Sequence, residues 1–232
     1  MALSPIREFG VKAVLWLPLA FVAWFWFAPL WVWPAVLLAK QVLLGHWGAL
    51  FASVTLGGEV LDDAGRVVAR AGYLVSLGTR VMVTVPASAA GPGGVGVLEP
   101  TLNPMVYAYS LPLFAGLAMA TPLPALRRAL QLALALAVIV LCQAFGIVTE
   151  SLKTLAFDAG AEGAAAIARA GLDPNTIALG YQFASLILPA VVPVALWIAF
   201  NRDFIEQLVA RDREPGAQAV GQSTHRNGDL DP

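Results

Sequence analysis

Hydrophobic residues in this chain gather in four long runs, separated by polar or alternating stretches. The runs cover residues 13–39, 103–121, 126–149 and 177–200, and the second is short and bounded by prolines. A helix that crosses a membrane needs roughly 20 mostly apolar residues. The pattern therefore predicts an integral membrane protein with an α-helical four-span bundle. The first run exceeds the roughly 7–15 apolar residues of a signal peptide, so we expect an uncleaved anchor.

Residues 40–102, between the first two runs, change from a helical to an alternating pattern. Apolar and polar residues alternate in FASVTLGGEVL, and the alternation returns in RVVARAGYLVSL and in TRVMVTVP. The composition DDAG at 62–65 is typical of a turn between strands. We predict a small antiparallel β meander of three strands, with residues 95–98 as a fourth short strand.

The remaining segments are polar or rich in small residues. Residues 150–176 are rich in Ala and Gly. We expect the third helix to extend into them and a short helix to follow near Glu162–Ala170. The sequence DPNT is typical of a helix start, with Asp173 as the cap and Pro174 in the first turn. Residues 201–232 lack periodicity and are predicted to form a largely disordered tail.

Basic residues are unevenly distributed over the segments between the runs. Cytoplasmic loops of membrane proteins carry an excess of Lys and Arg. Such residues occur in the N-terminal segment 1–12, in the link after the second run and in the tail; they are Arg7, Lys12, Arg127, Arg128, Arg202, Arg211, Arg213 and Arg226. Residues 150–176 contain more acids than bases. We predict that both termini are cytoplasmic and that residues 40–102 and 150–176 lie outside the cytoplasm.

Composition supports the membrane assignment and argues against several classes of function. The chain is 59% hydrophobic and 12% charged, whereas soluble domains contain about 25% charged residues. We therefore expect lipid to solvate much of the surface. The net charge of −1 and the lack of a basic stripe argue against nucleic-acid binding. The single cysteine, Cys142, excludes an internal disulfide and a thiolate metal site.

The predicted spans contain no ionisable residue that must lie at mid-depth. Membrane enzymes and ion-coupled carriers keep such residues because their chemistry requires them in spite of the cost of burial. We therefore expect a protein without catalytic residues, cofactors or metal ions. The polar residues of the spans are mild, and we expect them to form hydrogen bonds between helices. They are Gln131, Cys142, Gln143, Tyr181, Gln182 and Ser185.

The segment LNPMVYAYSLP opens the second run and permits two interpretations. In the structural one, Asn103 caps a helix and Pro104 occupies its first turn, where a missing N–H is harmless. In the functional one, polar residues at the outer end form a ledge that contacts a partner protein. The candidate contact residues are Asn103, Tyr107, Tyr109 and Ser110 in this segment, with Tyr181 and Gln182 in the fourth run. Both interpretations can hold together.

Three features together resemble one family of membrane proteins. They are the aromatic start LSPIREFGVKAVLWLPLAFVAWF, the strand-rich segment after it, and LNPMVYAYSLPLFAGLAMATP. Over residues 1–205 the layout resembles the exosortase H-associated membrane proteins, small partners of an exosortase in Gram-negative bacteria. The resemblance implies an accessory role beside an enzyme that recognises C-terminal sorting signals on exported proteins. Exosortases carry a Cys, Arg and His set, and Cys142 has no Arg or His placed with it, so the resemblance implies the helper and not the enzyme.

The leading hypothesis is a non-enzymatic accessory protein of the bacterial inner membrane, with a small periplasmic β domain. It assembles with an exosortase-type enzyme or presents substrates to it. The expected partners are membrane lipid and this integral-membrane protein.

Two alternatives belong to other classes of function. One is a small transporter or channel subunit with a polar cavity between its helices. The other is an enzyme of the outer leaflet in which acids and a histidine converge. The residues named for these sites are Gln143, Tyr181 and Gln182 for the cavity, and His46, Glu150 and Asp158 for the enzyme.

Overall fold

A computed structural model describes residues 5–61, 66–85 and 93–210 of the chain. The predicted turn at 62–65 and the tail beyond residue 210 lie outside the described residues. The α-helices are α1 (Pro5–Trp26), α2 (Ala28–His46), α3 (Met105–Ala108), α4 (Ser110–Ala120), α5 (Ala125–Lys153), α6 (Gly160–Arg169), α7 (Pro174–Gln182) and α8 (Leu188–Phe200), followed by a helix over residues 202–210. Two π-helical segments, Thr154–Asp158 and Phe183–Ile187, continue α5 and α7. The strands are β1 (Phe51–Leu61), β2 (Val67–Thr79), β3 (Met82–Val85), β4 (Gly94–Val97) and β5 (Thr101–Leu102).

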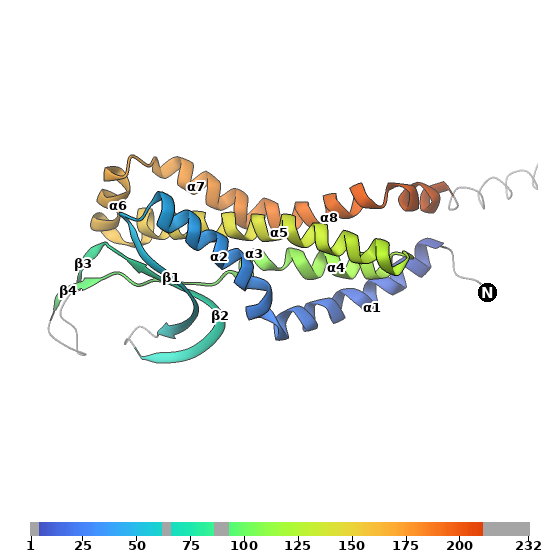
Figure 1. Ribbon diagram of the computed structural model, residues 1–232, viewed down its shortest axis with the longest axis horizontal. Helices are drawn as coiled ribbons and strands as arrows, with labels where there is room; N and C mark the ends of the chain where they lie inside the picture. The colour runs from blue at the N-terminus through green and yellow to red at the C-terminus, as the bar shows by residue number, and fades with distance from the viewer. Residues whose placement is uncertain (1–4, 62–65, 86–92, 211–232) are drawn as a thin grey trace, which may run out of the picture.

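The helices form an elongated bundle with the strands and α6 at one end, which we call the strand end (Figure 1). The start of α1, the link between α4 and α5, and the end of α8 lie at the opposite end, which we call the terminal end. The prediction that both termini lie on one side of a membrane requires this arrangement. The orientation of the two ends in a membrane stays a prediction.

Four helical stretches of the described chain are long and apolar enough to cross a membrane. They are Ile6–Trp26, Ala28–His46, Ala125–Asp158 and Pro174–Phe200. The last two contain the predicted spans 126–149 and 177–200. The predicted span 103–121 forms the shorter apolar stretch Met105–Ala120. The number of candidate helices agrees with the prediction, but their order along the chain differs from it.

The single helix predicted over residues 13–39 is instead two helices, α1 and α2, separated at Phe27. Phe27 has φ −104° and ψ 22°, and Pro29 stands in the first turn of α2. Proline removes a backbone donor, and its ring clashes with the carbonyl four residues earlier, here that of Phe25. α1 packs along α4, whereas α2 packs along α5 and the strands. The break therefore lets one apolar run contact two parts of the fold.

A glycine brings α1 and α4 together. A Cβ atom added at Gly116 of α4 would lie 2.6 Å from Cδ2 and 3.0 Å from Cα of Leu17. Small residues are typical of helix crossings in membranes because they let backbones approach closely. Phe114, Ala118 and Ile139 form the buried core beside this crossing.

The strands form two small sheets. β1 and β2 pair as a long antiparallel hairpin, and β5 pairs with β2 on its other side. β3 pairs with β4 in a separate two-stranded sheet. The predicted meander is therefore wrong in its third strand, because β3 leaves β2 and takes the predicted fourth strand as its partner. Thr79, the last residue of β2, stabilises the turn away from β2. Its hydroxyl donates to the Leu98 carbonyl at 2.7 Å and accepts from the Val81 N–H at 3.2 Å.

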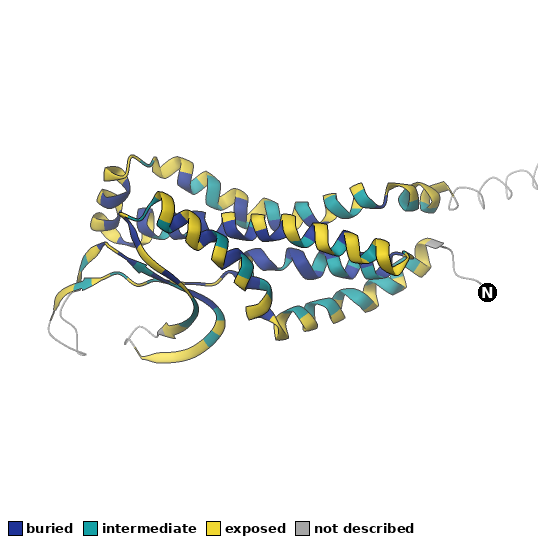
Figure 2. Ribbon diagram, viewed as in Figure 1, coloured by how far each residue is buried: buried dark blue, intermediate teal, exposed yellow. Residues whose placement is uncertain are grey.

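The β1–β2 hairpin is buried in one half and exposed in the other (Figure 2). Phe51, Val54, Val75 and Leu77 belong to the main core, together with residues of α2 and α5. The pairing is then interrupted by a bulge at Leu56–Gly58, where Gly57 has φ +98°. Beyond the bulge, the predicted alternation of apolar and polar residues does not coincide with alternately buried and exposed positions. We call residues 58–61 and 67–72 the hairpin arm.

The segments after the third predicted helix largely follow the expectation. α5 runs to Lys153, its π-helical continuation ends at Asp158, and α6 follows as the predicted short helix. Asp173 caps α7, since its Oδ2 accepts from the N–H and the hydroxyl of Thr176 at 2.9 and 2.8 Å. Residues 202–210 are helical, which corrects the start of the predicted disordered tail.

Candidate partner interface

Asn103 stands where β5 ends and α3 begins. Its Oδ1 accepts from the Met105 N–H at 3.2 Å, which supports the predicted helix start. Tyr107 and Ser110 are each 2% exposed, and Tyr109 is half-buried. The Ser110 hydroxyl donates to the Tyr107 carbonyl at 3.1 Å. Asn103 and part of Tyr109 thus remain at the surface of the predicted ledge, whereas its other two members lie in the interior.

Tyr107 packs against α5 at a glycine. A Cβ atom at Gly146 would lie 2.6 Å from the Tyr107 ring. The Tyr107 hydroxyl lies near the Glu150 carboxyl. Within the described chain, the amide of the buried Gln143 has no hydrogen-bond partner. Gln143, Gly146 and Glu150 share one face of α5 by their spacing. We call Tyr107, Gln143 and Glu150 the buried polar cluster.

Glu150 was expected at the end of the third span. The structure extends that helix, so Glu150 lies within the candidate crossing stretch Ala125–Asp158. An ionisable residue in such a stretch is costly to bury and is often functional. Among the described residues, the buried polar cluster is therefore a place where the structure departs from the expected apolar interior.

Tyr181 and Gln182 are the last residues of α7, directly before the π-helical segment Phe183–Ile187. Lys153 lies over the Tyr181 ring, with Nζ 5.5 Å from its centre, and also pairs with Asp158 at 2.8 Å. Gln182 is exposed. Pro189 follows the π-helical segment and lacks an N–H donor, which favours the altered hydrogen bonding there. Exposed apolar residues surround this point: Leu179, Phe183, Leu186, Ile187 and Val191. The contact role of Tyr181 and Gln182 stays a prediction.

The hairpin arm exposes apolar side chains and a strand edge. Val60, Val67 and Val68 are 41%, 45% and 60% exposed. Across the arm, Arg70 pairs with Glu59 at 2.7 Å. β1 is an edge strand of its sheet in the described chain. Such an edge presents unpaired N–H and C=O groups that can pair with another chain.

The residues named for the two alternative functions lie in different environments in the fold. His46 ends α2, is exposed, and has its ring centre 6.1 Å from that of Trp47. Among the described residues, no three His, Cys, Asp or Glu side chains are grouped to hold a metal ion. Gln143 is 1% exposed whereas Gln182 is exposed, so the structure does not bring these two glutamines to one surface.

The terminal end is closed by hydrogen bonds between helices. The Gln131 amide donates to Asn201 Oδ1 at 3.1 Å and to the Phe200 carbonyl at 3.3 Å, and Asn201 donates back to Gln131 at 3.3 Å. The predicted role of Gln131 between helices is confirmed. Sequence reasoning missed Asn201. Its position directly after the last apolar run, where helix carbonyls lack partners, is the signal that could have found it.

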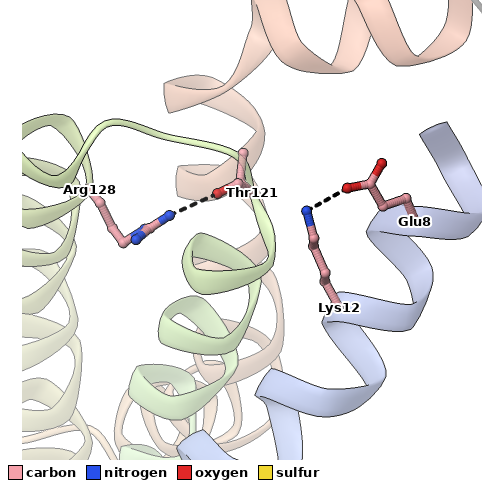
Figure 3. Close-up of polar contacts among 4 residues, drawn as sticks. All are labelled: Glu8, Lys12, Thr121 and Arg128. Atoms are coloured by element: carbon pink, nitrogen blue, oxygen red, sulfur yellow. Dashed lines mark hydrogen bonds and ion pairs between the residues drawn. The ribbon is translucent and has the colours of Figure 1, made fainter.

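Thr121, in the link between α4 and α5, joins three elements of the terminal end. Its hydroxyl accepts from Trp197 Nε1 at 2.9 Å. Arg128 of α5 donates to the Thr121 carbonyl at 3.3 Å, near the Glu8–Lys12 pair of α1 (Figure 3). Among the described residues, the basic side chains that predict a cytoplasmic side therefore lie on the same end as the ordered link: Arg7, Lys12, Arg127, Arg128 and Arg202.

A protein-family model matches residues 3–204 of this chain, a range that includes all helices from α1 to α8, and its family is described as exosortase H-associated membrane protein. The chain belongs to this family. The predicted resemblance is thereby confirmed. Comparisons with curated proteins and with solved structures found no match. For an exosortase H-associated membrane protein, the exposed surfaces described above are the candidates for association.

Proposed function

We propose that this chain is a non-enzymatic accessory protein of the bacterial inner membrane, which assembles with an exosortase-type enzyme or presents substrates to it. The observation that carries the proposal is the hairpin arm, an exposed strand pair in a chain whose family is described as exosortase-associated. An isolated hairpin is at best marginally stable in water. We therefore expect a partner to cover the arm.

The geometry of the arm favours a partner segment in extended conformation. A peptide that adds to an exposed strand edge gains main-chain hydrogen bonds, and its alternate side chains contact one face of the sheet. Val60 and Val68 offer apolar contacts to such a segment. Burial of apolar surface contributes about 25 cal/mol per Å².

A second contact surface lies on α7 and α8. Its exposed apolar residues face lipid or the helices of the enzyme, and Tyr181 and Gln182 lie at its outer part. The polar groups of Tyr181 and Gln182 provide hydrogen bonds that are specific to a protein partner.

In the proposed orientation the terminal end is cytoplasmic and the strand end is periplasmic. The support is the positive-inside rule applied to Arg7, Lys12, Arg127, Arg128 and Arg202. With Cys142 replaced by Ala, a cysteine at Ala164 is expected to react with an impermeant maleimide in cells with a permeable outer membrane. A cysteine at Ala125 is expected to remain unlabelled. The opposite labelling would reverse the orientation.

Co-purification tests the function itself. The tagged chain is expressed with an exosortase in mild detergent, and the recovered enzyme is quantified. Val68→Glu on the arm is expected to lower the recovery roughly tenfold or more, because burying an unpaired charge in an interface is unfavourable. Val95→Glu on β4 is the matched control, since Val95 is also an exposed strand valine, at 71%.

Two outcomes would count against the proposal. Failure of the unmodified chain to recover any exosortase would remove the accessory role. Equal losses for Val68→Glu and Val95→Glu would remove the arm as the contact. The alternative of a small transporter or channel subunit has its support in the buried polar cluster, and ion flux in proteoliposomes that is lost with Glu150→Gln would favour it.

A further inference from the structure

A groove at the strand end lies between α6 and the start of the β structure. Its volume is about 580 Å³, within the usual range for ligand pockets of roughly 300–1,000 Å³. Figure 1 shows α6 above β3 at this place. The lining residues are Ala49, Leu50, Arg80, Val81, Met82, Ala161, Glu162, Ala165, Ala166, Arg169 and Ala170.

Small side chains create the space. Three alanines of α6 line the groove together with Ala170 directly after the helix, and alanine cannot fill the gap between the helix and the strands. The apolar floor comprises Leu50, Val81 and Ala166, which are 4%, 6% and 4% exposed. Met82 is 63% exposed at the rim, and its flexible thioether adapts to different contacts. The groove therefore has a narrow apolar base suited to a backbone with small side chains.

Arg80 is held in place at one side of the groove. Its backbone N–H donates to the Leu50 carbonyl at 2.8 Å, and its Nε donates to the Gly48 carbonyl at 2.9 Å. The terminal guanidinium nitrogens have no acid partner within the described chain. A guanidinium in a fixed orientation loses less freedom when it binds a carboxylate.

Arg169 supplies the second positive charge, from the last turn of α6. No described acid pairs with it either. Glu162 also lines the groove, but it lies in the first turn of α6, where the helix dipole favours a negative charge. The groove therefore carries two guanidinium groups and one carboxylate. A single negative charge on the ligand would balance them.

We propose that this groove binds an extended segment of a partner protein that carries a carboxylate side chain. Arg80 and Arg169 bind the carboxylate through charge-assisted hydrogen bonds, which guanidinium groups form in bidentate geometry. The alanine side of α6 accommodates the backbone and small neighbouring side chains. The carboxylate of Glu162 favours a singly charged group over a doubly charged phosphate. This site goes beyond the proposed function, and it does not require that the partner be an exosortase.

A labelled peptide tests the site in the full detergent-purified chain. The probe is fluorescein-labelled Gly-Ala-Glu-Ala-Gly, and Gly-Ala-Gln-Ala-Gly is its neutral counterpart. Fluorescence anisotropy is expected to show at least roughly tenfold tighter binding of the Glu peptide, because a hydrogen bond to a charged group is worth more than a neutral one. Added salt is expected to weaken binding of the Glu peptide.

Matched variants separate the groove from general electrostatics. Arg169→Gln is expected to weaken binding of the Glu peptide roughly tenfold, whereas Arg202→Gln at the terminal end leaves it unchanged. Ala165→Leu fills the groove and is expected to abolish binding. Ala164→Leu, on the same helix but outside the lining, is expected to have no effect. The thermal transition of each variant checks that it folds.

Several results would overturn the proposal. They are equal affinity for the two peptides, equal losses for Arg169→Gln and Arg202→Gln, or undiminished binding in a folded Ala165→Leu variant. Binding of phosphatidylglycerol vesicles that depends on Arg169, without binding of the peptide, would assign the groove to lipid headgroups instead. If an exosortase still co-purifies while the peptide fails to bind, the groove assignment falls and the proposed function stands.

Discussion

Gln131 and Gln143 lie on the same helix, α5, and both are buried, yet their surroundings differ. Gln131 exchanges hydrogen bonds with Asn201 and also reaches the Phe200 carbonyl. Neither amide atom of Gln143 has a partner among the described residues. A polar side chain on an apolar helix thus joins helices only where a neighbour offers unused polar groups.

The end of a helix explains the difference. The Phe200 carbonyl at the end of α8 accepts from Gln131, and the side-chain amide of Asn201, directly after the helix, supplies the second partner. One turn from Gln143, on the same face of α5, the closest neighbour of Gly146 is the ring of Tyr107. An aromatic ring offers no strong hydrogen-bond acceptor to an amide. Gln143 is therefore left with unused bonding capacity.

Gly146→Ala is expected to have the largest effect on this region. The added methyl group would lie 2.6 Å from the Tyr107 ring, so α3 and α5 must separate. Overpacking of this kind lowers the free energy of unfolding by about 1–3 kcal/mol. Unfolding in mixed micelles measures the change. Gly45→Ala on α2, with no atom within 4 Å of its new methyl group, is the control. Equal stability of the two variants would show that α3 does not pack tightly on α5.

Gln131→Leu is expected to lower the free energy of unfolding by about 1 kcal/mol, because interhelical hydrogen bonds in membranes average about 0.6 and reach about 1.7 kcal/mol. It also removes Gln131 as a partner of the buried Asn201 amide, which still donates to the Trp197 carbonyl at 2.9 Å. The double variant Gln131→Leu, Asn201→Leu is expected to lose less than the sum of the single losses. Strict additivity would indicate that the two amides do not interact.

Gln143→Leu is expected to change stability in the opposite direction. Removal of a buried amide that lacks partners raises the free energy of unfolding by up to about 1 kcal/mol. The same mixed-micelle unfolding measures it, beside Gln131→Leu. A loss as large as that of Gln131→Leu would mean that Gln143 binds a group in the membrane-embedded protein.

Asp173 is an exposed polar residue, in contrast to the buried Gln131 and Gln143, and its protonation has the smallest expected effect. The Thr176 hydroxyl and N–H hold the pKa of this carboxyl below its usual value. A lowered pKa stabilises α7 above the unfolded pKa of about 3.9, and this contribution is lost as the pH falls through the folded value. Hydrogen exchange at the start of α7 is expected to rise on acidification. Asp173→Asn, which still caps but does not titrate, is expected to remove the acid dependence.

The fold was predictable where a periodic pattern exists. Alternation located the strand segments, and DPNT located the start of α7. The break at Phe27 was missed because a run that is apolar throughout has no periodicity to interrupt, and Pro29 is one of three prolines in it, of which Pro18 and Pro34 lie inside helices. The pairing of β3 with β4 instead of β2 was also missed. Strand partners are chosen by contacts distant in sequence, which alternation does not encode.

The candidate interface was predictable only in part. Asn103 is exposed as expected, but Tyr107 and Ser110 are buried because α3 turns toward α5 at Gly146. Arg80 and Arg169 are far apart in sequence, and neither belongs to a motif. Only the fold, which places α6 beside the strands, brings them to one groove.

The length of α5 with its π-helical continuation has a geometric consequence. Its 34 residues form a rod of roughly 51 Å at about 1.5 Å per residue. Even at a steep tilt of about 40°, such a rod rises through roughly 39 Å, more than the roughly 30 Å of hydrocarbon in a bilayer. In the proposed orientation, at least one end of such a rod therefore extends beyond the hydrocarbon into headgroups or water. α6 follows the rod directly at the strand end, so a rod that emerges at this end sets the height of α6 above the lipid.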